Sequence, residues 1–351
     1  MHNYTRRTSL AMAAASLCIL LVAYTGSRGS EPVVSAIAAH GELSVAGNRI
    51  LDSSGRVFSV TGPSLFWGNK GWTDKAAYGP DAYYNADVVA YLRREWNAPI
   101  IRIAMGSETP GGYIQDPDGR WQKITAVADA AIDEGMYFIV DWHSHHAEDN
   151  TADAIAFFER VANAYGQHPN LIYEIYNEPL NTTDWATVIK PYAEQVIAAI
   201  RAIDKDNLIL VGSQTWSQDV DKVADNPIKG FSNIAYTLHF YAGTHRQPLR
   251  DKAQYALDKG IALLVSEWGS VNATGDGAAD VEETRRWVEF MRANQLTHLN
   301  WSLHSKEEGA SILKPGSRPD ANWTDENFTI SGLLFRDIVL GWHQFDYSAG
   351  N

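Results

Sequence analysis

Short apolar runs alternate with amphipathic stretches along most of the chain. From residue 57 onward, eight strand-like runs end near Phe66, Met105, His143, Asn177, Ser213, Phe240, Glu267 and Leu303. The stretches between and after them repeat apolar residues at helical spacing, over residues 81–96, 126–134, 151–165, 188–203, 248–258, 281–294 and 331–342. Alternating β and α units predict a parallel sheet covered by helices, and eight such units predict a (β/α)8 TIM barrel of the α/β class.

The boundaries of this barrel follow from the flanking segments. Residues 41–52 alternate around Ala46-Gly47-Asn48, which predicts a short β-hairpin at the bottom of the barrel. We expect a linker over residues 31–40, one barrel domain over 41–345 and a tail over 346–351. A doubly wound open sheet is the alternative, but it favours a glycine-rich turn after its first strand, and residues 61–67 (TGPSLFW) do not form one.

Residues 1–30 have the pattern of an export signal. Arg6 and Arg7 precede an apolar run over residues 10–23, which is too short for a comfortable membrane span. The pair also loosely matches a twin-arginine signal, and an uncleaved anchor is the alternative. The signal predicts a secreted protein, extracellular or periplasmic, without stable membrane association once the signal is removed. Cys18, the single cysteine, lies inside this run, so we expect no thiol chemistry in the mature chain.

Composition narrows the choice of partners. The 351 residues are 45% hydrophobic, enough for one large domain with a buried core, and the formal net charge is −13. The sequence contains no Lys/Arg run suited to a polyanion, which argues against a nucleic-acid partner. An acidic surface is compatible with a neutral polymer as substrate, and a monomer is the default expectation.

Two of the strand-like runs end in a glutamate. Residues 171–179 (LIYEIYNEP) lead to Glu178, and residues 261–269 (IALLVSEWG) lead to Glu267. In a parallel barrel, the carboxyl ends of the strands form the face where chemistry takes place. Two carboxylates held together there can cleave a glycosidic bond, one as proton donor and the other as nucleophile or base. For Glu178 the alternative is structural, because Asn-Glu-Pro is also a typical start of a helix.

Polar residues at other strand ends support a site around these glutamates. Arg102 lies inside an apolar strand and needs a carboxylate partner; we expect Glu267, whose ionised form it would favour. An ordinary buried ion pair is the alternative. His239 and Tyr241 share one face of a strand, from which they can hydrogen-bond the two glutamates.

Three more candidate site residues lie at strand ends. His143 can contribute a hydrogen bond, Asn177 can donate to a sugar hydroxyl, and Trp301 offers a flat face for a pyranose ring.

The run His143-Ser-His145-His146 resembles a metal cluster, but neighbouring imidazoles on one strand end cannot converge on one ion without strain. We therefore expect no metal and no cofactor.

These positions together resemble glycoside hydrolase family 5, particularly its bacterial endo-β-1,4-glucanases (cellulases). The family's usual invariant positions correspond to Arg102, His143, Asn177, Glu178, His239, Tyr241, Glu267 and Trp301. The resemblance covers residues 43 to 342 and implies a retaining mechanism with Glu178 as acid/base and Glu267 as nucleophile.

The same resemblance implies a substrate groove for β-1,4-glucan. Trp67 would stack a sugar on the non-reducing side of the cut and Trp216 one on the leaving side, while Lys306 and Glu308 would bond hydroxyls. For Lys306 and Glu308, a solvated loop charge pair is the alternative. A mannanase, xylanase or mixed-linkage glucanase of the same fold is the nearest rival, and a non-catalytic sugar-binding barrel is a rival of another class.

Overall fold

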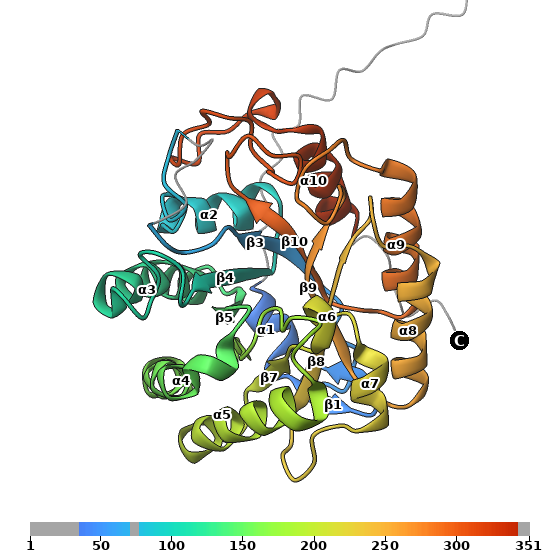
Figure 1. The fold of residues 1–351 in the computed structure, drawn as a ribbon. Coiled ribbons are helices and arrows are strands. Elements are labelled where there is room, and N and C mark those ends of the chain that lie inside the picture. The colour runs from blue at the N-terminus through green and yellow to red at the C-terminus, as the bar shows by residue number, and fades with distance from the viewer. Residues whose placement is uncertain (1–34, 71–76, 343–351) are drawn as a thin grey trace, which may run out of the picture. The chain divides into compact units, whose positions relative to one another are not determined.

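The computed structural model describes residues 35–70 and 77–342 and contains a closed parallel barrel (Figure 1). Its strands are β3 (Thr61–Leu65), β4 (Ile100–Gly106), β5 (Tyr137–His143), β6 (Leu171–Glu174), β7 (Leu208–Val211), β8 (Ile234–Tyr241), β9 (Leu263–Gly269) and β10 (His298–Leu303). They pair in the order β10-β3-β4-β5-β6-β7-β8-β9, and β9 pairs with β10 to close the ring. The predicted (β/α)8 fold is therefore confirmed, whereas the open-sheet alternative is wrong.

Helices surround the strands as the apolar spacing predicts. They are α2 (Ala86–Glu95), α3 (Pro117–Asp133), α4 (Thr151–Tyr165), α5 (Lys190–Ile203), α6 (Gln214–Ser217), α7 (Val220–Asp225), α8 (Gln247–Asp258), α9 (Val281–Ala293) and α10 (Ile330–Trp342). Asn85 begins α2 by accepting a hydrogen bond from the Val88 amide, and Asp116 caps α3 in the same way, from the Gly119 amide. Within residues 35–70 and 77–342, no helix combines the length and apolar character needed to cross a membrane.

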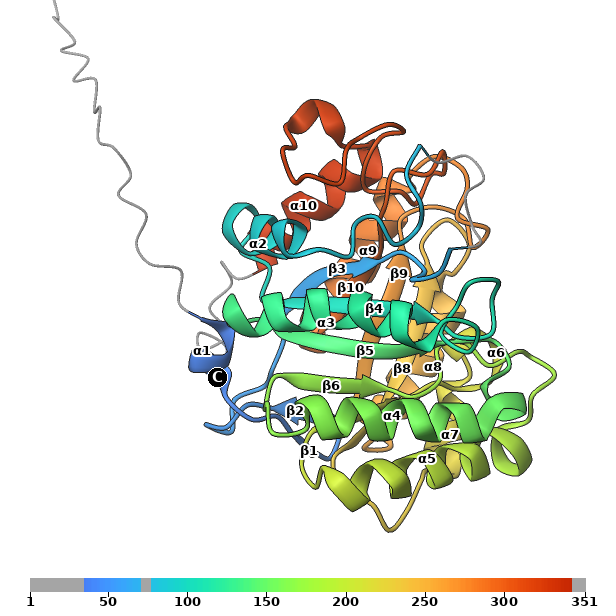
Figure 2. The ribbon, with the colours of Figure 1, turned by 90° about the vertical axis from the view of Figure 1, so that its left-hand side faces the viewer.

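The N-terminal end of the barrel is covered by a small helix and the predicted hairpin (Figure 2). The hairpin consists of β1 (Ser44–Ala46) and β2 (Arg49–Leu51). The expected linker over residues 31–40 is wrong in its last part, because Ala36–His40 form helix α1. Ser35 caps this helix, and the Ile37 amide bonds the Gly135 carbonyl at 3.1 Å, so the segment is anchored to the barrel.

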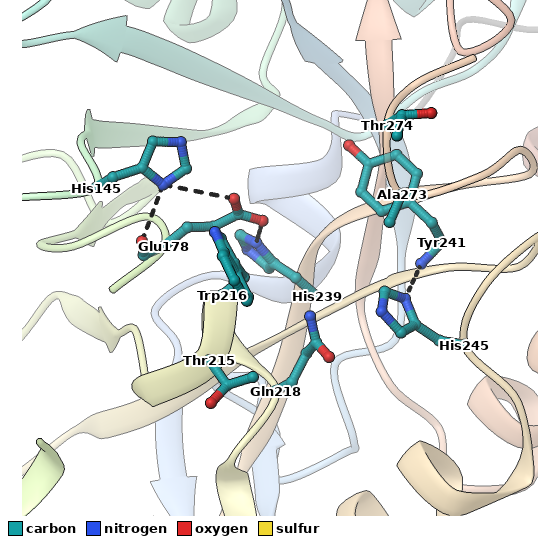
Figure 3. Close-up of a pocket in the computed structure, with 10 residues that line it drawn as sticks. All are labelled: His145, Glu178, Thr215, Trp216, Gln218, His239, Tyr241, His245, Ala273 and Thr274. Carbon is teal, nitrogen blue, oxygen red and sulfur yellow. Dashed lines mark hydrogen bonds and ion pairs between the residues drawn. The ribbon is translucent and has the colours of Figure 1, made fainter. Parts of the chain in front are cut away.

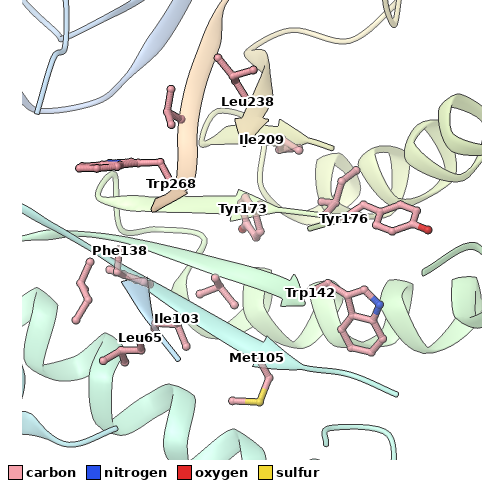
Figure 4. Close-up of a cluster of buried hydrophobic side chains, with 14 of the residues drawn as sticks. Leu65, Ile103, Met105, Phe138, Trp142, Tyr173, Tyr176, Ile209, Leu238 and Trp268 are labelled. Carbon is pink, nitrogen blue, oxygen red and sulfur yellow. The ribbon is translucent and has the colours of Figure 1, made fainter. Parts of the chain in front are cut away.

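The strands separate two kinds of interior. On their outer face, Ile103, Phe138, Trp142 and Leu238 pack against the helices (Figure 4). Inside the lower barrel, an apolar layer includes Ile100, Tyr137, Ile139, Ile172, Leu208, Leu210, Leu264 and Leu299, and it joins Leu43 and Ile50 of the hairpin segment. Toward the carboxyl ends of the same strands, the inward positions become polar. Apolar groups therefore fill the N-terminal end of the barrel, and polar groups line its C-terminal end.

Strand β9 contains one extra residue next to Glu267. Thr237 pairs with Leu264, but His239 pairs with Glu267, so two residues of β9 lie opposite one of β8. The pairing of β9 with β10 shifts at the same place. Such a bulge breaks the strict alternation of side chains. As a result, Ser266 and Glu267, although adjacent in sequence, both have their side chains inside the barrel, where each bonds residues of other strands.

The close approach of β3 and β4 gives a test of this packing. An added Cβ at Gly62 would lie 1.8 Å from the Ile100 carbonyl oxygen, which the backbone cannot accommodate without moving. We expect Gly62→Ala to lower the free energy of unfolding by about 3 kcal/mol or more, measured by urea denaturation. Gly79→Ala is the control, because its Cβ would meet only a side-chain oxygen at 3.6 Å. Equal stability of the two variants would contradict the tight pairing.

Candidate active site

Arg102 lies at the centre of the upper barrel and is fully buried. Its Nη1 group donates to Glu267 Oε2 at 3.0 Å, as the sequence predicts. Two further carboxylates also bind it: Nε donates to Glu174 Oε2 at 2.7 Å, and Nη2 lies 2.8 Å from Asp141 Oδ2. Nη2 also donates to Asn177 Oδ1 at 2.7 Å. The single-partner ion pair expected from the sequence is therefore a cluster of one guanidinium and three carboxyl groups.

Burial and Arg102 act in opposite directions on these acids. Burial alone would raise the pKa of Glu174, but Arg102 and the nearby His239 ring, 3.6 Å away, lower it to about 2, so Glu174 is ionised. For Asp141, burial dominates over the attraction of Arg102 and raises the pKa well above its usual value. Asp141 is therefore harder to ionise than Glu174, which limits the negative charge buried around Arg102.

Glu178 and Glu267 converge at the top of this cluster. Carboxylate oxygens of the two residues lie within 4.8 Å of each other and of a ring nitrogen of His239. Glu178 follows β6 on the loop and is partly exposed, whereas Glu267 on β9 is only 4% exposed. Both acids thus reach one small region from separate strands, as the sequence predicts.

Each of the two oxygens of Glu267 has a fixed donor. Arg102 donates to Oε2, and the Tyr241 hydroxyl donates to Oε1 at 2.9 Å. Burial raises the pKa of Glu267, and the charge of Glu178 raises it further, although His239, Arg102 and Tyr241 lower it. The expectation that Arg102 favours the ionised form of Glu267 is confirmed, because Arg102 lowers the pKa. Burial beside a second acid outweighs this effect, so the pKa lies above its usual value.

Glu178 is held by two histidines. His239 Nδ1 lies 3.0 Å from Glu178 Oε1, as predicted, and His145 Nδ1 bonds the Glu178 carbonyl at 3.0 Å (Figure 3). His145 Nδ1 is also 3.8 Å from Glu178 Oε2. The amide of Glu178 donates to the Ser144 carbonyl at 3.2 Å, which fixes the backbone from which the side chain extends.

His143, Asn177 and Trp301 lie beside this pair. The rings of His143 and Trp301 stack with centroids 5.1 Å apart and planes within 4°. His143 Nδ1 contacts Asp141 Oδ2 at 2.7 Å, and burial lowers the pKa of His143 well below its usual value, so the ring is neutral. Because Asn177 Oδ1 accepts from Arg102, its amide nitrogen is directed away, 3.5 Å from His143 Nε2.

The histidine run does not form a metal cluster. His143 contacts Asp141, whereas His145 contacts Glu178, so the two rings serve different acids. Within the described part of the chain, the group that could best approach an ion is Glu178, His239 and Glu267. Arg102 and His239 place positive charge beside that group, which opposes a divalent cation there.

An open pocket of about 500 Å³ lies against Glu178 (Figure 3). It is lined by His145, Glu178, Thr215, Trp216, Gln218, His239, Tyr241, His245, Ala273 and Thr274. Trp216 is 37% exposed, and Thr215, Trp216 and Ser217 all have left-handed backbone angles, with φ of 62°, 53° and 57°. The Trp216 amide bonds the Pro179 carbonyl at 2.8 Å, so this strained turn is tied to the loop that carries Glu178.

The other predicted sugar contacts lie toward β3 and β10. The centroids of the Trp67 and His143 rings are 4.6 Å apart in an edge-to-face arrangement, and His143 also stacks on Trp301. Lys306 Nζ and Glu308 Oε1 form an ion pair at 3.1 Å, and both side chains are largely buried rather than solvated. Sequence reasoning missed Asp141, Glu174 and Ser266 as members of the polar network. For Asp141 and Glu174, the available signal was an acid inside an apolar strand.

The buried guanidinium gives the site a test. Arg102→Lys keeps the charge but loses the planar donors that bind several acids at once, so we expect the free energy of unfolding to fall by about 3 kcal/mol. Arg94→Lys is the control, because the Arg94–Glu134 pair is on the surface and should change stability by less than about 0.5 kcal/mol. Similar urea-unfolding curves for the two variants would contradict the role of Arg102.

Comparison with known proteins identifies the family. The family model "Cellulase (glycosyl hydrolase family 5)" matches residues 51–307. Endoglucanase Z of Dickeya dadantii is 50% identical over 309 residues, which cover 88% of this chain and 68% of that protein. An endoglucanase of Clostridium saccharobutylicum is 40% identical over 342 residues, covering 97% and 73% of the two chains.

Solved structures agree with these relatives. A structure from Cytophaga hutchinsonii has a TM-score of 0.83 at 45% identity and covers 88% of this chain and 98% of its own. The catalytic domain of Thermobifida fusca endoglucanase Cel5A has a TM-score of 0.80 at 29% identity and covers 87% and 99%. A variant of that domain, similar at 28% identity, was solved in complex with cellotetraose. The family match over most of the chain, together with relatives at 40% and 50% identity, shows that this chain belongs to glycosyl hydrolase family 5, the cellulase family.

Proposed function

We propose that this protein is a secreted, retaining endo-β-1,4-glucanase that cuts internal bonds of cellulose and related β-glucans. Membership of a glycosidase family supports the reaction class. The names of the similar proteins, endoglucanases from several bacteria, support the substrate and the endo mode of cleavage. The complex of the Thermobifida fusca domain with cellotetraose supports β-1,4-glucan as the ligand of this type of site.

The separation of the two acids is the observation that carries the retaining mechanism. Retaining glycosidases hold their carboxyl groups about 5–5.5 Å apart, whereas inverting ones leave about 6.5–9.5 Å for a water molecule. Oxygens of Glu178 and Glu267 within 4.8 Å of each other support the retaining class. Because inversion needs space for a water molecule between the base and the sugar, this short separation of the two acids supports Glu267 itself as the nucleophile.

The reaction then proceeds in two displacements. Glu267 attacks the anomeric carbon and forms a glycosyl ester, while the bond to the glycosidic oxygen breaks and Glu178 gives that oxygen its proton. Water next enters the leaving-group side, loses a proton to Glu178 and releases the sugar from Glu267. Arg102 and Tyr241 hold the two oxygens of Glu267, and His239 adjoins Oε1 of Glu178.

The assignment of Glu178 as acid/base agrees with its surroundings. Glu178 borders the open pocket beside Trp216, where a departing sugar and an incoming water can be accommodated. Glu267 lies deeper, between Arg102 and Tyr241. Trp67 and the Lys306–Glu308 pair lie toward β3 and β10, and we assign to them the sugars on the non-reducing side.

A defined cellooligosaccharide tests the function directly. We expect internal cleavage, and proton NMR during the first turnovers should show the new reducing end in the β configuration. A parallel panel of soluble polymers should show faster release of reducing sugar from carboxymethylcellulose than from mannan or xylan. An α anomer would refute retention, faster cleavage of mannan or xylan would move the substrate to that polymer, and binding without hydrolysis would indicate a non-catalytic sugar-binding barrel.

Substitution of the two acids separates their roles. Glu178→Gln removes the proton donor, so we expect turnover of carboxymethylcellulose to fall by about 10²–10⁴-fold, with a smaller loss of glycosylation rate on aryl cellobiosides whose leaving group needs no proton. Glu267→Gln should abolish turnover of both substrates, because no glycosyl ester can form.

The control for these variants is Glu307→Gln, which changes an exposed acid in the loop after β10 and should keep wild-type turnover. Full activity of Glu178→Gln on the polymer, or of Glu267→Gln on either substrate, would contradict the assigned roles. Circular dichroism and cellooligosaccharide binding confirm that each variant is folded.

Export is part of the proposal. We assign residues 1–30 as a cleaved signal peptide, on the basis of the two arginines and the apolar run that follows them. Sequencing the N-terminus of protein recovered from culture medium or periplasm tests this assignment, and an intact Met1 in the exported protein would refute it.

A further inference from the structure

A buried hydrogen-bonded chain runs beneath Glu178. His239 Nδ1 contacts Glu178 Oε1 at 3.0 Å, and the opposite ring nitrogen, Nε2, contacts Ser266 Oγ at 2.8 Å. Ser266 Oγ in turn donates to Glu174 Oε1 at 2.7 Å. Ser266 and Glu174 are fully buried, and His239 is 1% exposed. Neither Ser266 nor Glu174 is among the residues that line the pocket beside Glu178, and the two displacements described above assign no role to either of them.

The direction of every hydrogen in this chain follows from its buried end. Arg102 donates to both oxygens of Glu174, at 2.7 and 3.1 Å, and keeps that acid ionised, so Glu174 can only accept. Ser266 has a single hydroxyl proton and gives it to Glu174. The remaining lone pairs of Ser266 Oγ then accept from His239, which requires a hydrogen on His239 Nε2.

One ring nitrogen of His239 is thereby left to exchange protons. We propose that Ser266 and Glu174 are positioning residues of the acid/base step, which keep a hydrogen on His239 Nε2 so that His239 exchanges protons with Glu178 through Nδ1 alone. With the opposite tautomer, Nδ1 would carry a fixed hydrogen and could not accept a proton from Glu178. This inference rests on the proposed role of Glu178 and extends it to two residues that do not contact the sugar.

The charges around His239 determine the sign of the effect. The titratable or charged groups that surround it are Arg102, Asp141, His143, Glu174, Glu178, Tyr241 and Glu267, from β4, β5, β6 with its following loop, β8 and β9. Burial lowers the pKa of His239, but the neighbouring acids Glu174, 3.6 Å from Nε2, and Glu178, 3.0 Å from Nδ1, raise it to about 9. His239 therefore keeps both ring hydrogens into alkaline solution.

The bulge in β9 makes this chain possible. In a regular strand, a residue next to Glu267 would point outward, as Trp268 does. Because β9 has one extra residue opposite β8, Ser266 points inward with Glu267. The nucleophile and the positioning hydroxyl are consequently neighbours in the sequence and bond different partners.

Removal of the hydroxyl tests the proposal through the pH profile. Ser266→Ala removes the hydroxyl that accepts from His239 Nε2 at 2.8 Å and leaves only the longer contact with Glu174 Oε1, at 3.6 Å. This weakens the imidazolium, so His239 should lose its proton at lower pH. We expect the alkaline limb of kcat/KM on a cellooligosaccharide to move down by about one pH unit, with little change on the acid side of the optimum. Ser266→Thr retains the hydroxyl and should keep the wild-type limb.

Two results would overturn the proposal. One is an alkaline limb that does not move in Ser266→Ala, and the other is an equal loss of activity at every pH, which indicates a structural role only. Glu174→Gln provides a second variant, because it removes the anion but retains an oxygen that accepts from Ser266. We expect its alkaline limb to move in the same direction, and an unchanged limb would count against Glu174.

The tautomer of His239 can also be measured without any variant or substrate. In ¹⁵N-labelled wild-type protein, we expect Nε2 to remain protonated across the titration and Nδ1 to lose its proton at high pH. A protonated Nδ1 with a bare Nε2 at high pH would overturn the proposal even if the variants do not fold. This measurement does not depend on the proposed substrate, so failure of the wild-type enzyme to cut β-1,4-glucan would refute the proposed function separately.

Discussion

The guanidinium of Arg102 shares the upper barrel with the acids Asp141, Glu174 and Glu267, all sealed from water. A charge placed there is stable only if its partners satisfy it, and acids this close to one another repel unless a cation lies between them. Arg102 therefore permits the concentration of acids that the site needs. It also explains why the pKa values of neighbouring carboxyl groups shift in opposite directions, since each group balances burial against one shared cation.

This cluster occupies a defined level of the barrel. Below it, Ile139, Ile172 and Leu210 belong to the apolar layer that fills the interior and extends to the hairpin segment. Above it, Glu178 and Trp216 border an open pocket. The environment inside the barrel thus changes along each strand, from an apolar layer, through the ion-paired layer around Arg102, to the open pocket. Glu267 lies in the ion-paired layer, whereas Glu178 borders the pocket.

Much of this arrangement could be predicted from the sequence, because strand ends and apolar periodicity are local signals. The positions of Glu178 and Glu267, the Arg102–Glu267 contact and the bonds from His239 and Tyr241 all follow from barrel topology. Contacts that depend on three-dimensional closure could not be predicted: Asp141 and Glu174 join Arg102 from other strands, and the net pKa of Glu267 reflects burial that no sequence pattern measures. Helix α1 was missed for the same reason, since its anchor is 98 residues away in the sequence, between Ile37 and Gly135.

The extra residue in β9 has a consequence for protein engineering. Two successive side chains can both point inward only where the strand contains an extra residue. The placement of Ser266 and Glu267 therefore depends on the bulge as well as on the identity of the two residues. Transfer of the catalytic groups onto another eight-stranded scaffold by point substitution would leave one of these two side chains facing the surrounding helices. A successful transplant would have to carry the insertion with it, and a natural relative that lost the insertion would have to obtain its histidine acceptor from a different strand.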